Sequence, residues 1–132
     1  MIKVLELESY IDELQEDLPE SLPNLLSSKK DQRIIERVLQ IMIECVIDIS
    51  LLLIKELHLG PPQNEENIFN LLKNHLSNYT QLNEMRGFRN ILVQRYGIID
   101  PSLMYQFATE DLDDFRTFIT DVKNIIQDQK EN

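Results

Sequence analysis

The segment from Ile34 to Ile54 constrains the fold most, because it is apolar around most of a helical circumference. Asp31 is a suitable N-cap before it, and the glycine and two prolines at 60–62 end it, which predicts a helix from Asp31 to about Leu57. A helix buried on one side only has a single apolar stripe. We therefore expect this helix to be sandwiched between other helices of the chain and a second subunit, as in a homodimer.

The rest of the chain is typical of further helices separated by a few turns. Only three glycines occur, and the five prolines mark the ends of helices. The spacing of apolar residues predicts four more helices, over residues 2–18, 65–76, 80–96 and 101–129. We predict an all-α fold, a bundle of about five helices that forms a single domain over residues 1–132.

Composition excludes several classes of protein. Cys45 is the one cysteine, so disulfide scaffolds and zinc modules are excluded, and we expect a buried, inert thiol. No carboxylates and histidines are spaced as metal ligands, and we predict neither a metal nor another cofactor. Apolar runs fall short of the ~18 residues of a membrane span, and the acidic N-terminus is unlike a secretion signal. We expect a cytoplasmic protein with no membrane partner.

The net charge of −10 is concentrated at the two ends of the chain. Residues 1–20 hold seven carboxylates against one lysine, and residues 110–132 hold seven against three basic residues. The middle, 21–109, has nine acids and nine bases, with three arginines clustered within residues 86–95. A broad basic surface for nucleic acid is thereby excluded, whereas a narrow basic site in the middle of the chain is compatible with this distribution.

One polar stripe interrupts the apolar wall of the long helix. Gln40, Glu44 and Asp48 recur every four residues, with Arg37 one turn before them. Charges are costly to bury unless they are paired. The stripe therefore either faces water or lies against something positive, and in the second case its carboxylates would orient the arginines of the helix predicted over 80–96.

That helix has two neighbouring polar stripes close to its C-terminus. They consist of Arg89, Val93 and Tyr96 on one stripe and Arg86, Asn90 and Gln94 on the next. The planar fork of an arginine binds phosphate with two hydrogen bonds, and amides hold oxygens in place. This chemistry suits a phosphodiester, although an ion-pair network with the long helix would also explain the pattern.

The octapeptide RNILVQRY, from Arg89 to Tyr96, resembles the R-x4-H-x-Y signature of the HepT-like family, the HEPN-domain ribonuclease toxins of prokaryotic toxin–antitoxin pairs. The similarity covers nearly the whole chain. Residues 36–49 resemble the long second helix of that family, residues 60–62 its turn, and residues 96–101 the entry to its last helix.

The resemblance implies a HEPN-like bundle that dimerises, so that the motifs of two subunits line a shared cleft. In such toxins RNA is cleaved without a metal: a ribose 2′-hydroxyl attacks the adjacent phosphate, histidine moves the proton and arginine stabilises the charge. On this resemblance Arg89 is the phosphate-stabilising catalytic arginine, and Asn90 is its polar neighbour. Arg86, on the adjoining stripe, is a second supporting residue.

This chain departs from the signature at Gln94, which stands where the family has histidine. Glutamine forms hydrogen bonds but does not exchange a proton near pH 7. Loss of a general acid–base group costs about 10² to 10⁴ in rate, whereas an arginine at position 89 retains electrostatic stabilisation. His58 and His75 lack the motif spacing to Arg89, so we assign neither to catalysis. We expect feeble or absent cleavage.

The resemblance also implies a partner. In the family, a minimal nucleotidyltransferase antitoxin transfers AMP to the motif tyrosine and silences the toxin, which makes Tyr96 the expected AMP acceptor. The alternative is that Tyr96 is an aromatic packing residue.

Three functions remain open from the sequence. The first is an RNA-cleaving toxin attenuated by Gln94; the second is a non-catalytic HEPN-fold module that binds a nucleotidyltransferase or RNA; the third is a structural bundle. In an unbroken helix, Arg89 and Gln94 lie about 140° apart around the axis. They serve one phosphate only if the helix loosens between them or if two subunits contribute.

Overall fold

The computed structural model describes residues 2–94 and 100–131, with side chains up to residue 90 in the first range. Seven helices occur in these ranges, with no strand between them. Their bounds are Ile2–Asp17 (α1), Leu22–Leu26 (α2), Lys29–Glu56 (α3), Asn67–Leu71 (α4), Tyr79–Gln94 (α5), Pro101–Glu110 (α6) and Leu112–Glu131 (α7). The prediction of an all-α bundle is confirmed.

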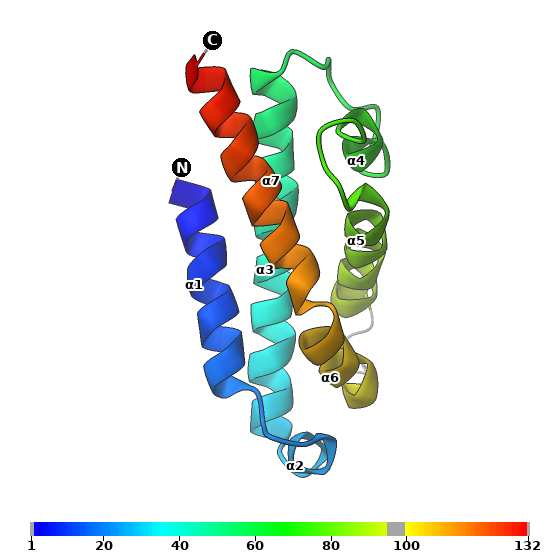
Figure 1. The fold of residues 1–132 in the computed structure, drawn as a ribbon. Helices are drawn as coiled ribbons and strands as arrows, with labels where there is room; N and C mark the ends of the chain where they lie inside the picture. Colours follow the sequence, from blue (N-terminus) through cyan, green and yellow to red (C-terminus); the bar gives the residue numbers. More distant parts are fainter. Residues whose placement is uncertain (1, 95–99, 132) are drawn as a thin grey trace.

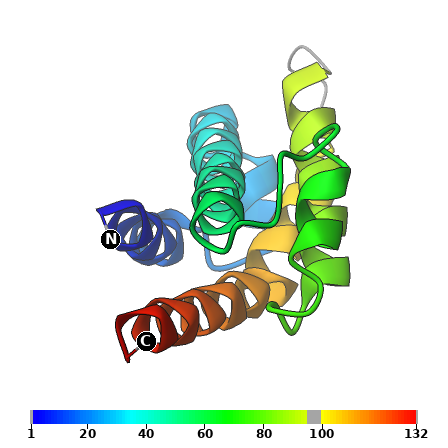
Figure 2. The same ribbon diagram turned by 90° about the horizontal axis from the view of Figure 1, so that it is seen from above.

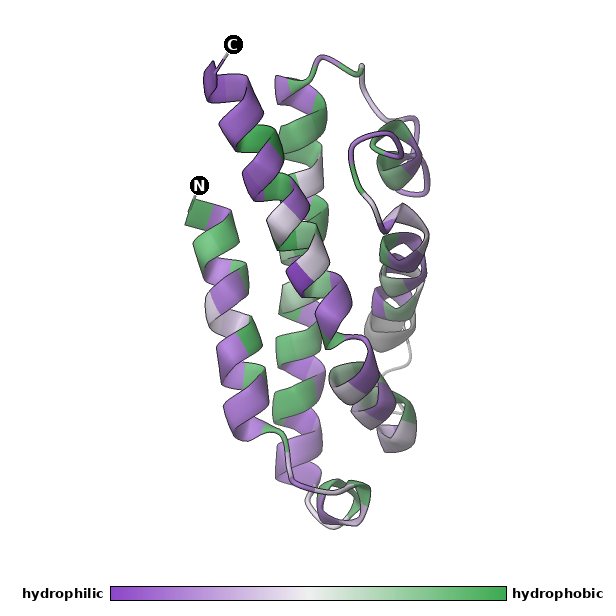
Figure 3. Ribbon diagram, in the orientation of Figure 1, coloured by the Kyte–Doolittle hydropathy of each residue, from purple (hydrophilic) through white to green (hydrophobic). Residues whose placement is uncertain are grey.

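The long helix α3 forms the centre of the bundle. In Figure 1, α1 lies along one side of α3. Helices α4 and α5 lie on the opposite side of α3, and α7 passes in front of it, between α1 and α5. Figure 2 shows the same arrangement from above, with both termini on the same side of the molecule. The hydropathy colouring in Figure 3 makes α3 the most apolar of the long helices, whereas much of α1 and α7 is hydrophilic.

Twelve residues of α3 are buried by this chain alone, whereas the prediction placed a second subunit on one side of the helix. Leu39, Met42 and Ile49 are among the fully buried ones, and they belong to one core cluster with residues from all six other helices. Leu51 and Leu52 remain 39% and 43% exposed. A second subunit is therefore not required to cover most of α3, and the homodimer stays a prediction.

Cys45 is buried in α3, as expected. Burial raises the pKa of its thiol, which keeps the group protonated. None of the described helices is both long and apolar enough to cross a membrane.

Several helix boundaries differ from the prediction. The N-cap of α3 is Ser28, whose Oγ accepts a hydrogen bond from the amide of Asp31 (3.2 Å). Asp31 lies in the first turn, where its charge still suits the helix dipole. A further short helix, α2, begins after its own N-cap Ser21.

The helices predicted over 65–76 and 101–129 are shorter than expected. The first is only α4, followed by turns as far as Asn78, whose side-chain amide donates to the backbone oxygen of Asp114 (3.0 Å). The second is divided at Asp111 into α6 and α7. The ring of Phe107 before the break meets the edge of Phe115 after it, with centroids 6.0 Å apart, so both sides of the bend keep their aromatic residues in the core.

Candidate functional site

The site is built on α5, whose apolar residues fix how the helix is rotated. Leu82 and Met85 are buried in the core, and the ring of Phe88 stacks on Phe107 of α6 with centroids 4.6 Å apart. These contacts hold one face of α5 against the bundle. Arg86 and Arg89 consequently lie on the side of α5 that meets the segment before α4.

Arg86 and Arg89 share one carboxylate, that of Glu65. The Nη2 of Arg89 donates a hydrogen bond to Oε1 of Glu65, and Nη1 of Arg86 lies 3.9 Å from the same oxygen. Arg86 also donates from Nε to Oδ1 of Asn83 (3.3 Å). Two guanidinium charges therefore face a single negative charge, which leaves this group of three side chains with a net positive charge.

The two guanidinium groups are largely shielded from water. Their side chains are 13% and 18% exposed, whereas that of Glu65 is 38% exposed. The Nε of Arg89 is buried, and within the described residues it has no hydrogen-bond partner. A buried donor without an acceptor is costly. The arginine pair thus offers an anion both unbalanced charge and an unused donor.

The polar stripe of α3 does not orient Arg86 or Arg89, so that alternative is wrong for these two arginines, and Arg95 lies outside the described residues. Gln40 donates to Glu44 within the stripe (3.3 Å), Asp48 lies 3.6 Å from the ammonium of Lys3 on α1, and Arg37 is exposed. The stripe faces α1 and water because α1 and α5 lie on opposite sides of α3. The arginines take their partner from the α3–α4 connection instead.

Sequence reasoning missed Glu65. It precedes the arginines by 21 and 24 positions and lies in a polar segment that was predicted to begin a helix. Nothing in helical periodicity links such a residue to α5, since the contact depends on how the connection folds back. The available signal was a carboxylate close to the turn in an otherwise amide-rich stretch.

The motif residues beyond Asn90 are described only in part. Asn90 is half-buried on α5, and the α5 backbone continues as a helix to Gln94. The Gln94 side chain and Tyr96 lie outside the described residues. His58 and His75 are exposed; His58 follows the end of α3, and His75 lies in the turns after α4.

Within residues 2–94 and 100–131, no three His, Cys, Asp or Glu side chains are placed to hold a metal ion. The chemistry of this site is that of two arginines, neighbouring amides and one carboxylate. Such a group can bind an anion such as a phosphate and stabilise negative charge that develops on it.

Three solved structures have the same fold over nearly the whole chain. One is a toxin–antitoxin with AMP-PNP, 25% identical, covering 92% of this chain and 95% of that chain at a TM-score of 0.84. The second is the tri-AMPylated HEPN toxin of Shewanella oneidensis in complex with an MNT antitoxin, 25% identical, with coverage of 92% and 94% and a TM-score of 0.84. A mutant MntA–HpeT toxin–antitoxin matches at 25% identity, with coverage of 92% and 95% and a TM-score of 0.83.

Among curated proteins, none is similar enough to the chain to count as a match. The family comparison is decisive, because residues 7–122 match the family described as Ribonuclease HepT-like. That range begins in α1, ends in α7 and includes the arginine pair with Glu65. The chain belongs to the Ribonuclease HepT-like family.

Proposed function

We propose that this protein is the toxin of a toxin–antitoxin pair and that it acts on RNA at the arginine pair of α5. The observation that carries the proposal is the shielded, incompletely neutralised pair Arg86 and Arg89 in a chain of the HepT-like family. Arg89 begins the R-x4-Q-x-Y segment, and Arg86 lies three residues before it. The solved structures with the same fold are themselves toxins with antitoxins, which supports this assignment.

The proposed reaction is a metal-independent transesterification. The ribose 2′-oxygen attacks the adjacent phosphorus, the bond to the 5′-oxygen breaks, and the products are a 2′,3′-cyclic phosphate and a 5′-hydroxyl. Arg89 stabilises the negative charge on the phosphoryl oxygens, with Arg86 and Asn90 supporting it. Gln94 orients oxygens by hydrogen bonds but moves no proton, so the proton passes to and from water and the rate is low.

The geometry of α5 favours a site shared between two subunits. The helix is unbroken from Arg89 to Gln94, so these positions lie about 140° apart around its axis. One phosphate would then meet Arg89 of one subunit and Gln94 of the other. We therefore propose a homodimer as the active form, and sedimentation showing only monomer at micromolar concentration would contradict it.

A cleavage assay in the presence of a chelator tests the RNA-directed function. We expect that wild-type protein cuts RNA slowly or not at all, that Gln94→His raises the rate about 10²-fold or more, and that Arg89→Ala abolishes whatever cleavage exists. Arg116→Ala is the matched control, because that arginine is exposed on α7 and, among the described residues, its one ion pair is with Asp113 three residues away (3.0 Å). If neither wild type nor Gln94→His cleaves RNA while RNA still binds, the enzymatic proposal fails.

A second function is favoured by Gln94 itself: a non-catalytic module that binds RNA or a nucleotidyltransferase partner. In that case RNA binding depends on Arg89, and none of the variants cleaves. Binding of a labelled RNA measured by anisotropy, alongside the cleavage assay, separates the two functions.

We also propose that the partner is a minimal nucleotidyltransferase and that Tyr96 accepts AMP from it. Co-expression with a nucleotidyltransferase encoded next to this chain, followed by mass spectrometry, should show an added AMP on the peptide that contains Tyr96. Tyr96→Phe should remove that mass. Unmodified peptide after co-expression would overturn the assignment.

A further inference from the structure

Glu65 occupies the place that a phosphate would take at the arginine pair. Its Oε1 receives the Nη2 hydrogen bond of Arg89 and lies 3.9 Å from Nη1 of Arg86. A phosphodiester also carries one negative charge and uses the same guanidinium donors. Glu65 and a bound phosphate therefore exclude each other from these donors.

The surroundings of the three side chains suit an exchange of anions. The arginines are 13% and 18% exposed and belong to a regular helix, whereas Glu65 is 38% exposed and lies in the irregular connection between α3 and α4. The neighbouring hydrogen bonds of that connection are local and exposed, such as the one from the amide of Asn67 to Oδ1 of Asn64 (2.9 Å). Glu65 can regain water without breaking a helix, whereas the arginines cannot follow it.

Glu65 uses the hydrogen-bond donors of the arginine pair only in part. One carboxylate oxygen serves both guanidinium groups, and the buried Nε of Arg89 has no acceptor in the part of the chain that the structure describes. A phosphate has two non-bridging oxygens, as a carboxylate does, but it is not tethered to the chain and can place one oxygen against each arginine, whereas Glu65 places Oε1 near both. Removing an existing anion without supplying another would leave two shielded cations unpaired, which is costly.

We propose that Glu65 is a built-in competing anion: it partly neutralises the arginine pair in the free protein, and a phosphate binds by displacing its carboxylate. Arg86 is then the second phosphate ligand, beside Arg89. That the phosphate belongs to RNA rests on the function proposed above, whereas the competition itself does not. A positioning role, in which Glu65 stays in place and holds Arg89 for the substrate, is the opposite prediction.

Glu65→Gln separates these roles, because it keeps the shape of the side chain and removes its charge. We expect the variant to bind inorganic phosphate, measured by thermal shift, and a DNA oligonucleotide, measured by anisotropy, about tenfold more tightly than wild type. DNA lacks the 2′-hydroxyl and is not cleaved by the proposed reaction. Adding Arg89→Ala to Glu65→Gln should cancel the gain.

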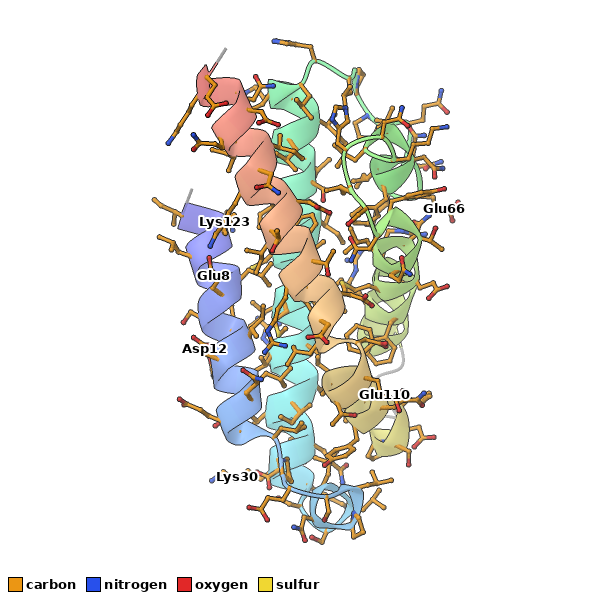
Figure 4. The ribbon with its side chains drawn as sticks, in the orientation of Figure 1. Glu8, Asp12, Lys30, Glu66, Glu110 and Lys123 are labelled. Atoms are coloured by element: carbon orange, nitrogen blue, oxygen red, sulfur yellow. The ribbon has the colours of Figure 1, made fainter. Side chains whose placement is uncertain are left out.

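Glu66→Gln is the matched control, because it removes the same charge from the adjacent residue. Glu66 is exposed and forms no side-chain capping hydrogen bond at α4, and Figure 4 shows it at the outer edge of the bundle. A general reduction of negative charge would raise binding equally in both variants, and equal gains would overturn the proposal. Binding by Glu65→Gln that equals or falls below wild type would overturn it as well and favour positioning.

Folding provides a second measurement. If Glu65→Gln folds in phosphate but not without it, the arginine pair requires an anion and the proposal is supported. If Glu65→Gln folds in neither condition, Glu65→Asp is tested in its place. The shorter side chain withdraws the carboxylate from the arginines, so this variant should bind phosphate more tightly than wild type. Equal or weaker binding of phosphate would contradict the competition.

The outcomes for this inference and for the proposed function are distinguishable. If the double variant with Glu65→Gln and Gln94→His binds phosphate and DNA more tightly but does not cleave RNA, the competition is supported and the proposed ribonuclease activity is contradicted. If Gln94→His cleaves RNA but Glu65→Gln binds anions no more tightly than wild type, the ribonuclease activity is supported and the competition is contradicted.

Discussion

Charged residues on the two sides of α3 differ in how much water they contact. On the α1 side, Lys3 lies 3.6 Å from Asp48, with side chains 42% and 52% exposed. On the α5 side, Arg89 is 18% exposed against Glu65 at 38%. Exposed pairs contribute little because water already solvates both charges. The charged side chains on the α1 side are therefore in contact with water, whereas the arginine on the α5 side is largely withdrawn from it.

The outer face of α1 and α7 illustrates the first case. Glu8 and Lys123, labelled in Figure 4, form an ion pair of 3.1 Å between the two helices, with side chains 39% and 57% exposed. The face also keeps Leu5 66% exposed. Stability on this side therefore comes from the apolar residues beneath the charges.

The largest expected effect on the free energy of unfolding compares a buried with an exposed leucine on α1. Leu7→Ala should lower the free energy of unfolding by about 2 to 5 kcal/mol, because Leu7 is fully buried and its removal leaves a cavity. Leu5→Ala on the same helix should change it by less than about 0.5 kcal/mol. Urea denaturation measures both. A large cost at Leu5 would mean that this face is covered in solution.

A smaller effect is expected at the arginine pair. Arg89→Ala should lower the free energy of unfolding by about 1 to 3 kcal/mol, since it removes a charged hydrogen bond to Glu65, although the half-exposed carboxylate regains water. Arg116→Ala should cost less than about 0.5 kcal/mol, because its pair with Asp113 is exposed. Equal costs in urea denaturation would remove the contrast between the two sides of α3.

The helix that carries the site also contains a glycine that its fold does not need. A Cβ added at Gly87 meets no atom within 4 Å among the described residues. Gly87→Ala should therefore raise the free energy of unfolding by about 0.5 to 1 kcal/mol through its higher helix propensity. A loss of stability, measured by thermal denaturation, would show that something else packs against α5 at this position.

The smallest effect concerns pH. Burial, followed by the neighbouring charges of Asp114, Glu110 and Glu84, raises the pKa of Asp111 above its ordinary value of 3.8. The folded state then binds this proton more tightly than the unfolded state, so stability falls as pH rises through the raised pKa. Asp111→Asn should stabilise the protein at pH 7 by less than about 1 kcal/mol, and this gain should shrink toward pH 4.

Asp12→Asn is the control for that measurement, because Asp12 is exposed on α1. Its stability should differ little from wild type at either pH. Urea denaturation at pH 7 and pH 4 gives both values. A gain at Asp111 that grows as the pH falls would contradict the raised pKa.

Much of the fold could be predicted from local pattern. Apolar periodicity gave the long helices within a few residues, because burying a stripe of side chains stabilises a helix whatever lies opposite. The break at Asp111 was missed because no proline or glycine marks it, and it depends on both Phe107 and Phe115 reaching the core. The N-cap Ser28 was missed because Asp31, three residues later, is an equally good capping residue.

The candidate site was predictable in its motif but not in its electrostatics. Arg89 and Asn90 follow from the spacing of the signature, and the family match confirms the resemblance on which they were chosen. Their roles, and those of Gln94 and Tyr96, stay predictions. The α3 stripe was one of two alternatives for the carboxylate that meets Arg86 and Arg89, and the carboxylate comes from Glu65 instead.

The sequence by itself determined the helical class, the family and the position of the arginines along α5, because these depend on residues that are close together in the chain. Tertiary structure decided which acid pairs with the arginines and how far each charge is removed from water. Both depend on how the α3–α4 connection folds back onto α5, and no periodicity encodes a contact between a turn and a helix 21 to 24 residues later.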